Sequence, residues 1–142
     1  MAEYLFLHLA SEAGRSGDFS VQSAGVAAIE NDSAADQAIR VLSNKSITDI
    51  LKHRAQSVTP DLIKTADLVL TMTRSHKERL LALYPEGGEK IFTLKEYTVL
   101  PKEKEDPKYC LDIQDPYGQS VGIYEKCAGE LEVYLKRLLN QI

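Results

Sequence analysis

The spacing of apolar residues along the chain predicts alternating helices and short strands. Apolar side chains fill most positions from Tyr4 to Ala10, and Gly14 follows shortly after. This predicts a largely buried helix over about residues 1–13, ended by the glycine. Near the other end, apolar residues recur every three or four positions, which predicts one long helix from Ser120 onward. The recurring positions are Tyr124, Cys127, Leu131, Tyr134, Leu135 and Leu138.

Three segments between these helices have the pattern of strands. Residues 19–23 alternate between polar and apolar, whereas residues 67–72 form a compact apolar run typical of a strand buried on both faces. Residues 90–94 form the third short strand. Because helical patterns separate the strands, the sequence predicts an α/β fold with a small parallel sheet.

The predicted intervening helices have recognisable starts. Asp32-Ser33 is a candidate N-cap for a helix with one apolar stripe. Thr59-Pro60 combines a capping threonine with a proline at the first helical position. Thr73 is a further candidate cap. The stripe of the first of these helices consists of Ala38, Ile39, Val41 and Leu42.

Composition limits the class of protein. A chain of 142 residues with 44% hydrophobic content fits one domain over residues 1–142. The net charge of -4 does not suit a nucleic-acid-binding protein, and no apolar run reaches the roughly 18 residues that cross a membrane. Two cysteines are too few for a disulfide framework. We therefore expect a cytoplasmic protein with no nucleic-acid or membrane partner.

The best local candidate for chemistry is the run Asp115-Pro116-Tyr117-Gly118. An aspartate before proline is held extended, which can direct its carboxyl group into a cleft at the carboxyl ends of the strands. Tyr117 could stack on a flat substrate group. Taken alone, however, the tetrapeptide is more typical of a type I surface turn.

Other polar residues give weaker signals. His8, His53 and His76 have no metal-ligand spacing, so neither a metal nor another cofactor is expected. Ser11 and Arg15 flank the end of the first predicted helix without a glycine-rich phosphate loop. We interpret them as ordinary helix-end residues.

Several segments in one order carry a resemblance to a known family. They are Met1-Ala2-Glu3 with Leu5-Phe6, Ser23-Ala24-Gly25, residues 65–73 with His76, residues 92–97, and Asp115-Pro116-Tyr117-Gly118 with Tyr124. Together they resemble the low-molecular-weight protein-tyrosine phosphatases, in particular the bacterial branch that includes protein-arginine phosphatases. The stretch from about Leu100 to Ile113 departs from shorter members.

The resemblance implies a three-layer α/β/α, flavodoxin-like fold and a two-step reaction on a phosphorylated protein. In the family, a thiolate in a Cys-x5-Arg-Ser loop attacks phosphorus, and an aspartic acid protonates the leaving group. Asp115 matches that general acid, and Tyr117 matches the aromatic residue that lines the substrate slot. Neither phosphotyrosine nor phosphoarginine is favoured.

The nucleophile of the family is not among these residues. Pro116 stands six residues after Cys110, and Val133 stands six residues after Cys127, so neither cysteine begins a Cys-x5-Arg loop. In the family, that loop and a central first strand precede the residues that match Met1-Ala2-Glu3. We therefore expect this chain to lack both and to be inactive alone, which a start assigned to an internal methionine would explain.

Two alternatives stay open. One is a non-catalytic homologue that binds a partner through the retained cleft. The other is an arsenate reductase on the same fold, which needs relay cysteines on a mobile loop; Cys110 and Cys127 suit this poorly, since one is expected in a loop and the other on a helix. Nothing in the sequence indicates the oligomeric state.

Overall fold

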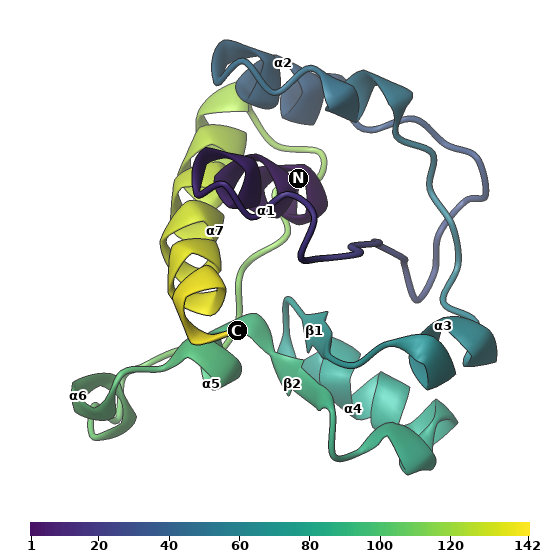
Figure 1. Cartoon of the computed structure of the whole chain (residues 1–142), viewed down its shortest axis with the longest axis vertical. Helices are drawn as coiled ribbons and strands as arrows, with labels where there is room; N and C mark the ends of the chain where they lie inside the picture. Colours follow the sequence, from purple (N-terminus) through teal and green to yellow (C-terminus); the bar gives the residue numbers. More distant parts are fainter. The chain divides into compact units, whose positions relative to one another are not determined.

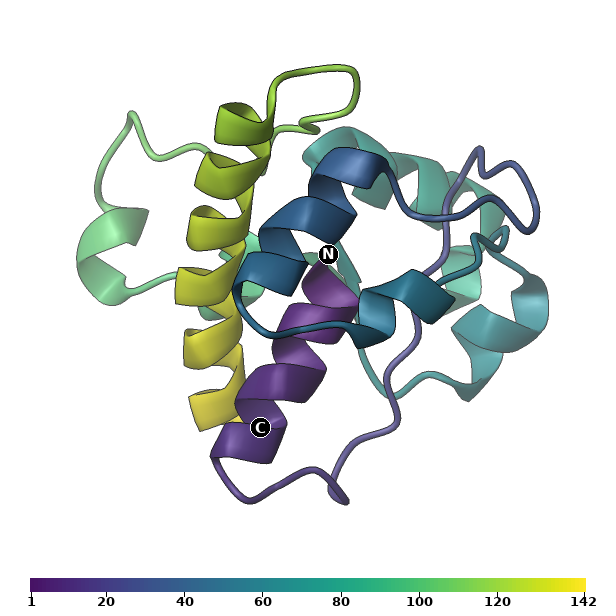
Figure 2. The ribbon, with the colours of Figure 1, turned by 90° about the horizontal axis from the view of Figure 1, so that it is seen from above.

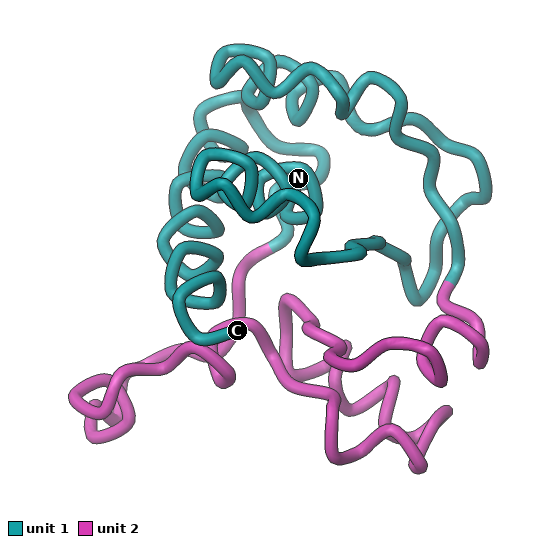
Figure 3. The backbone as a smooth tube through the Cα atoms, viewed as in Figure 1, with its two compact units in different colours: residues 1–57, 115–142 teal, residues 58–114 magenta.

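The computed structural model describes all 142 residues, which divide into two compact units (Figure 3). Unit 1 comprises Met1–Ser57 and Asp115–Ile142, and unit 2 comprises Val58–Gln114. The prediction that residues 1–142 form a single domain stays a prediction.

Unit 1 is built on helices. The N-terminal helix α1 (Ala2–Glu12) packs against the long C-terminal helix α7 (Val121–Gln141), and α2 (Asp36–Asn44) also contacts α7 (Figures 1 and 2). A short 3-10 helix, η1 (Asp49–Lys52), contacts α2. The buried side chains of the three α-helices are Leu5, Phe6, Leu9, Ala10, Ala38, Val41, Leu42, Tyr124, Cys127, Ala128, Leu131, Leu135, Leu138 and Leu139. The apolar stripes predicted for these helices are therefore largely confirmed.

The ends of the unit 1 helices agree only in part with the sequence. Gly14 follows α1 with a φ of 71°, a backbone conformation that favours glycine, as expected for a helix stop. The predicted cap at Asp32-Ser33 is wrong, since α2 starts after Ala35 and has no side-chain cap. The backbone carbonyl of Asp32 instead accepts a hydrogen bond from Ala55 N at 2.8 Å, which keeps Asp32 in the preceding connection.

The strand predicted over residues 19–23 is also wrong. The segment is irregular, and the nearest pairing is an isolated parallel bridge between Gly25 and Ser57. Gly25 N donates to Gln56 O at 2.9 Å, and the Gln56 side chain donates to Ser23 O at 2.9 Å. A strand exists only where a neighbouring strand completes its backbone hydrogen bonds, and no strand pairs with residues 19–23.

Unit 2 contains the parallel sheet. Strands β1 (Val69–Thr71) and β2 (Ile91–Thr93) pair in parallel with Leu70 opposite Phe92. Both predicted strands are confirmed but shorter, and only Thr71 of β1 is fully buried, so the expected burial on both faces is partial. The α/β class with a small parallel sheet is confirmed, while the missing central strand stays a prediction. The other elements are α3 (Pro60–Thr65), α4 (Arg74–Leu83), η2 (Pro85–Gly87), α5 (Leu94–Thr98) and α6 (Pro101–Lys104).

Threonines begin three of the unit 2 helices. Thr59 Oγ1 accepts from Leu62 N at 3.2 Å, and Thr73 Oγ1 accepts from His76 N at 3.2 Å. Both predicted caps are therefore confirmed. Thr93 forms a capping box with Glu96, whose carboxylate also pairs with Lys77 at 2.7 Å and joins α5 to α4.

None of the helices combines the length and the apolar content needed to cross a lipid bilayer.

Candidate functional site

The run Asp115-Pro116-Tyr117-Gly118 forms a tight turn in unit 1, just before α7. Asp115 Oδ1 accepts a hydrogen bond from Tyr117 N at 3.0 Å. Gln119 N donates to Pro116 O at 3.0 Å, and Gly118 has a φ of 76°. The side chain of Gln119 donates to Asp115 O at 3.2 Å. The type I turn predicted over Asp115–Gly118 is therefore wrong: the turn starts one residue later, at Pro116, and has Gly118 with its positive φ at the third position. The bond from Tyr117 N fixes one oxygen of the Asp115 carboxyl group.

The turn presents its polar and aromatic side chains to solvent. Asp115 is exposed, Tyr117 is 79% exposed, and Pro116 between them is buried. The Asp115 carboxyl group makes no hydrogen bond other than the one within the turn. The loop therefore has a buried proline between a carboxyl group and an aromatic ring that are both accessible from solvent.

Tyr124 links this loop to the first turns of α7. Its side chain is 4% exposed, and burial raises the pKa of its hydroxyl group above the ordinary value. The negative charges of Asp115 and Tyr117 raise that pKa further. The three residues that the resemblance groups together therefore lie close enough to interact electrostatically.

The two cysteines lie in different environments. Cys127 is buried in α7, and burial followed by the charge of Glu130 raises the pKa of its thiol. Cys110 is exposed in the irregular stretch after α6, with its Sγ 3.9 Å from Asp112 O. The structure thus agrees with the interpretation of Cys127 as a buried helix residue.

None of the hydrogen bonds or ion pairs of the three histidines involves the Asp115 loop. His8 Nε2 lies 3.5 Å from Glu12 Oε1, and His53 Nδ1 lies 3.4 Å from the Tyr4 hydroxyl. His76 belongs to the first turn of α4. No group of three or more histidine, cysteine, aspartate or glutamate side chains could hold a metal ion.

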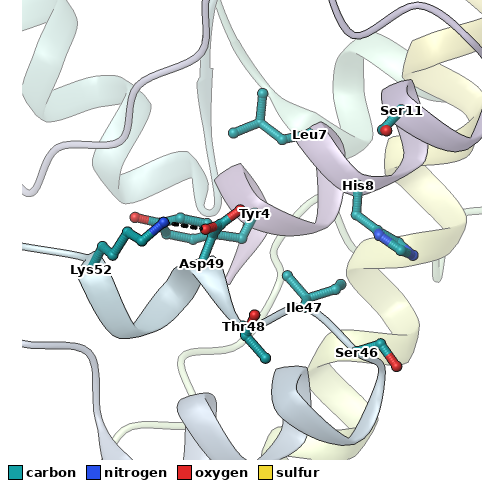
Figure 4. A pocket seen from close by; sticks show the side chains of 9 residues that line it. All are labelled: Tyr4, Leu7, His8, Ser11, Ser46, Ile47, Thr48, Asp49 and Lys52. Atoms are coloured by element: carbon teal, nitrogen blue, oxygen red, sulfur yellow. Dashed lines mark hydrogen bonds and ion pairs between the residues drawn. The ribbon is translucent and has the colours of Figure 1, made fainter.

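A groove of about 450 Å³ lies between α1 and residues 46–52 in unit 1 (Figure 4). Among its polar groups, Lys52 Nζ donates to Asp49 Oδ1 at 2.8 Å, and the Tyr4 hydroxyl lies 3.4 Å from His53 Nδ1. Neither Asp115 nor Tyr117 lines it. The groove is therefore separate from the candidate loop. Its walls are formed by Tyr4, Leu7, His8, Ser11, Ser46, Ile47, Thr48, Asp49 and Lys52.

The sequence did not single out Asp112. In unit 2, its Oδ1 accepts hydrogen bonds from the backbone N of Arg74 at 2.8 Å and from Arg74 Nε at 3.4 Å. These bonds lower the pKa of Asp112, the backbone bond most strongly. The partner lies 38 residues away, so no local pattern could have identified the pair.

Comparison with known proteins places the whole chain in one family. The family model described as low molecular weight phosphotyrosine protein phosphatase matches residues 1–142. A protein-arginine-phosphatase of Bacillus subtilis (strain 168) is 37% identical over 142 residues, covering 100% of this chain and 87% of the relative.

Solved structures give the same result. The YwlE arginine phosphatase, in a mutant form with a phosphorylated active-site serine, superposes with a TM-score of 0.86 at 36% identity, covering 99% of this chain and 84% of that one. The low molecular weight protein tyrosine phosphatase from T. tengcongensis also gives a TM-score of 0.86, at 38% identity over 99% of this chain and 88% of that one. The resemblance seen in the sequence is confirmed: this chain belongs to the low molecular weight phosphotyrosine protein phosphatase family.

Proposed function

We propose that this chain is the larger part of a phosphatase that acts on phosphorylated protein side chains, with Asp115 as its general acid. The observation that carries the proposal is the Asp115 turn. It holds one carboxyl oxygen at 3.0 Å from Tyr117 N and leaves the group exposed, in a chain that matches the phosphatase family from end to end. Tyr117 would contact the phosphorylated side chain.

The reaction proceeds in two steps. A cysteine thiolate attacks phosphorus, the bond from phosphorus to the substrate oxygen or nitrogen breaks, and the leaving atom takes a proton from Asp115. The Asp115 carboxylate then accepts a proton from water, whose oxygen attacks phosphorus and breaks the sulfur–phosphorus bond. Phosphate leaves and the thiolate is restored. An arginine and backbone N–H groups stabilise the charge on the other phosphoryl oxygens.

We propose that the thiolate and the arginine come from residues outside these 142. Neither Cys110 nor Cys127 begins a Cys-x5-Arg loop, and Cys127 is buried with a raised pKa. Loss of a covalent nucleophile costs on the order of 10⁶ in turnover, so the 142 residues alone are expected to be inactive. The thiolate chemistry also requires a reducing compartment, which suits a cytoplasmic location.

The side chain that carries the phosphate is an open part of the proposal. One relative is named as an arginine phosphatase and another as a tyrosine phosphatase. Both phosphotyrosine and phosphoarginine therefore belong in the test.

The proposal is tested by comparing the 142-residue chain with an upstream-extended form. The extension adds roughly 10 to 15 residues, enough for one strand and a Cys-x5-Arg loop. The extended protein should hydrolyse phosphotyrosine or phosphoarginine, whereas the 142-residue chain should hydrolyse an aryl phosphate no faster than its Asp115→Ala variant.

The matched control is the same extension with serine in place of its cysteine, which should be inactive. Asp115-dependent turnover by the 142-residue chain would contradict the proposed origin of the nucleophile. An extended protein that folds and yet leaves both substrates intact would contradict the phosphatase activity and favour a partner-binding homologue.

A further inference from the structure

Asp112 ties the segment before the candidate loop to the start of α4. Its Oδ1 accepts from the backbone N of Arg74 at 2.8 Å and from the guanidinium Nε at 3.4 Å. The first N–H groups of a helix have no partners within the helix, so an aspartate there satisfies a donor and interacts favourably with the helix dipole. Thr73 satisfies a second donor, that of His76. Asp112 and Thr73 therefore satisfy two of the first backbone donors of α4.

The next residue is held as well. Ile113 N donates to Met72 O at 2.8 Å, directly after β1, and the Ile113 side chain is 2% exposed. The side chain of Asp112 is itself only 21% exposed, and the charge of Lys95, a buried residue of α5, also favours its ionised form. By contrast, residues 105–108 are exposed and lie outside any helix or strand. The chain is thus fixed at two consecutive residues after a solvent-exposed stretch.

We propose that Asp112 is a positioning residue for the general acid. Asp115 follows Ile113 by two residues, so its Cα can lie no more than about 7 Å from that of Ile113. The hydrogen bonds that hold Asp112 and Ile113 therefore restrict the position of Asp115 and of its carboxyl group. This inference rests on the proposed phosphatase function, because it assigns Asp112 a role through Asp115 and no contact with substrate.

The experiment uses the upstream-extended protein with two aryl phosphates, one with a poor leaving group (phenyl phosphate) and one with a good one (2,4-dinitrophenyl phosphate). The readout is kcat/KM, which reports formation of the cysteinyl-phosphate and not its later hydrolysis, the step in which Asp115 accepts a proton from water for every substrate. A misplaced general acid lowers kcat/KM only for a substrate whose leaving group needs protonation. Asp112→Ala should lower kcat/KM for phenyl phosphate by about tenfold, less than full removal of the acid, and should leave kcat/KM for 2,4-dinitrophenyl phosphate nearly unaffected. Asp112→Asn retains an acceptor oxygen and should lower kcat/KM for phenyl phosphate by less than Asp112→Ala does.

A double substitution separates positioning from a general structural role. In the Asp115→Ala background, Asp112→Ala should cause no further loss of kcat/KM for phenyl phosphate, because the two residues act on the same step. The matched control is Glu105→Gln, which alters one exposed carboxylate in the same stretch and should leave the rates unchanged.

A measurement without catalysis tests the anchoring itself. In the 142-residue chain, Asp112→Ala should speed amide hydrogen exchange at Ile113 and Tyr117, and Glu105→Gln should not. Unchanged exchange would overturn the proposal.

The outcomes distinguish this inference from the function on which it rests. If the parent shows Asp115-dependent turnover, three results would overturn the positioning role alone. They are equal losses on both substrates, additive losses in the double variant, and rates for Asp112→Ala equal to those of Glu105→Gln. A folded but inactive parent would overturn the phosphatase function and this role with it.

Discussion

At the scale of single residues, the Arg15 side chain makes hydrogen bonds with residues that are distant in the sequence. Its Nη1 donates to Leu139 O at 2.8 Å and its Nη2 donates to Ile142 O at 3.0 Å. Its guanidinium also lies 4.7 Å from the centre of the Phe19 ring. The arginine thus satisfies carbonyl groups at the C-terminal end of α7, where a positive charge is also favoured by the helix dipole.

Arg15→Met should lower the free energy of unfolding by about 2 kcal/mol, because two charge-assisted hydrogen bonds and the dipole interaction are lost. Urea unfolding followed by circular dichroism measures the change. Arg40→Met, which removes an exposed arginine from α2, is the matched control and should change stability by less than about 0.5 kcal/mol. Equal effects of the two substitutions would show that the contacts of Arg15 contribute nothing.

Sequence reasoning recognises residues whose role is local and overlooks those with distant partners. The proline and glycine of residues 115–118 correctly indicated a local turn, although it spans Pro116–Gln119 and not the predicted type I turn over Asp115–Gly118. Whether Asp115 and Tyr117 perform the proposed chemistry stays a prediction. Arg15 looked like an ordinary helix-end residue, since its carbonyl partners lie 124 and 127 residues away. Asp112 was overlooked for the same reason.

At the scale of elements, helices were predictable because their apolar repeat and their caps are local. The start of α4 at Thr73 and the buried stripe of α7 were both foreseen. Strands are less predictable, because a strand needs a neighbour that the local sequence does not specify. Residues 19–23 have the alternating pattern of a strand and remain irregular without a paired neighbour.

The contact between α2 and α7 contains a charge cluster with a predictable pH dependence. Glu132 of α7 pairs with Lys136 at 2.8 Å and with Lys45, at the end of α2, at 2.9 Å. Hydrogen bonds from Lys136 and then Lys45 lower the pKa of Glu132 to about 2. Because the folded-state pKa lies below the ordinary value of 4.5, the stabilisation is present above about pH 4.5 and is lost as the pH falls towards 2.

At pH 6, Glu132→Gln should lower the free energy of unfolding by about 1 kcal/mol, since solvent screening reduces the value that the full pKa shift would imply. The difference from the unsubstituted chain should shrink steadily between pH 4.5 and pH 2 in urea unfolding experiments. Glu125→Gln, at an exposed position of the same helix, is the matched control and should change the free energy of unfolding at pH 6 by less than about 0.5 kcal/mol. A deficit that stays constant over this range would refute the electrostatic explanation.

At the scale of the whole molecule, the order of elements gave the α/β class, and the family comparison agrees with it over residues 1–142. The sequence pattern did not reveal that the two chain ends belong to one compact unit. That grouping depends on the packing of α1 against α7, between residues more than a hundred positions apart. Such long-range contacts are decided by the fit of side chains, which a periodic pattern does not encode.

The central claim is that Asp115 gives a proton to the leaving group. It is tested most directly by how kcat/KM depends on leaving-group pKa across a series of aryl phosphates, for the upstream-extended protein and for its Asp115→Asn variant. We expect a shallow dependence for the parent and a steep one for the variant, with a loss of roughly 10² to 10⁴ for the poorest leaving groups. The assignment of Asp115 as the general acid would be contradicted if kcat/KM depended on leaving-group pKa with the same slope in both proteins. In that case Asp115→Asn would slow every substrate equally or none at all.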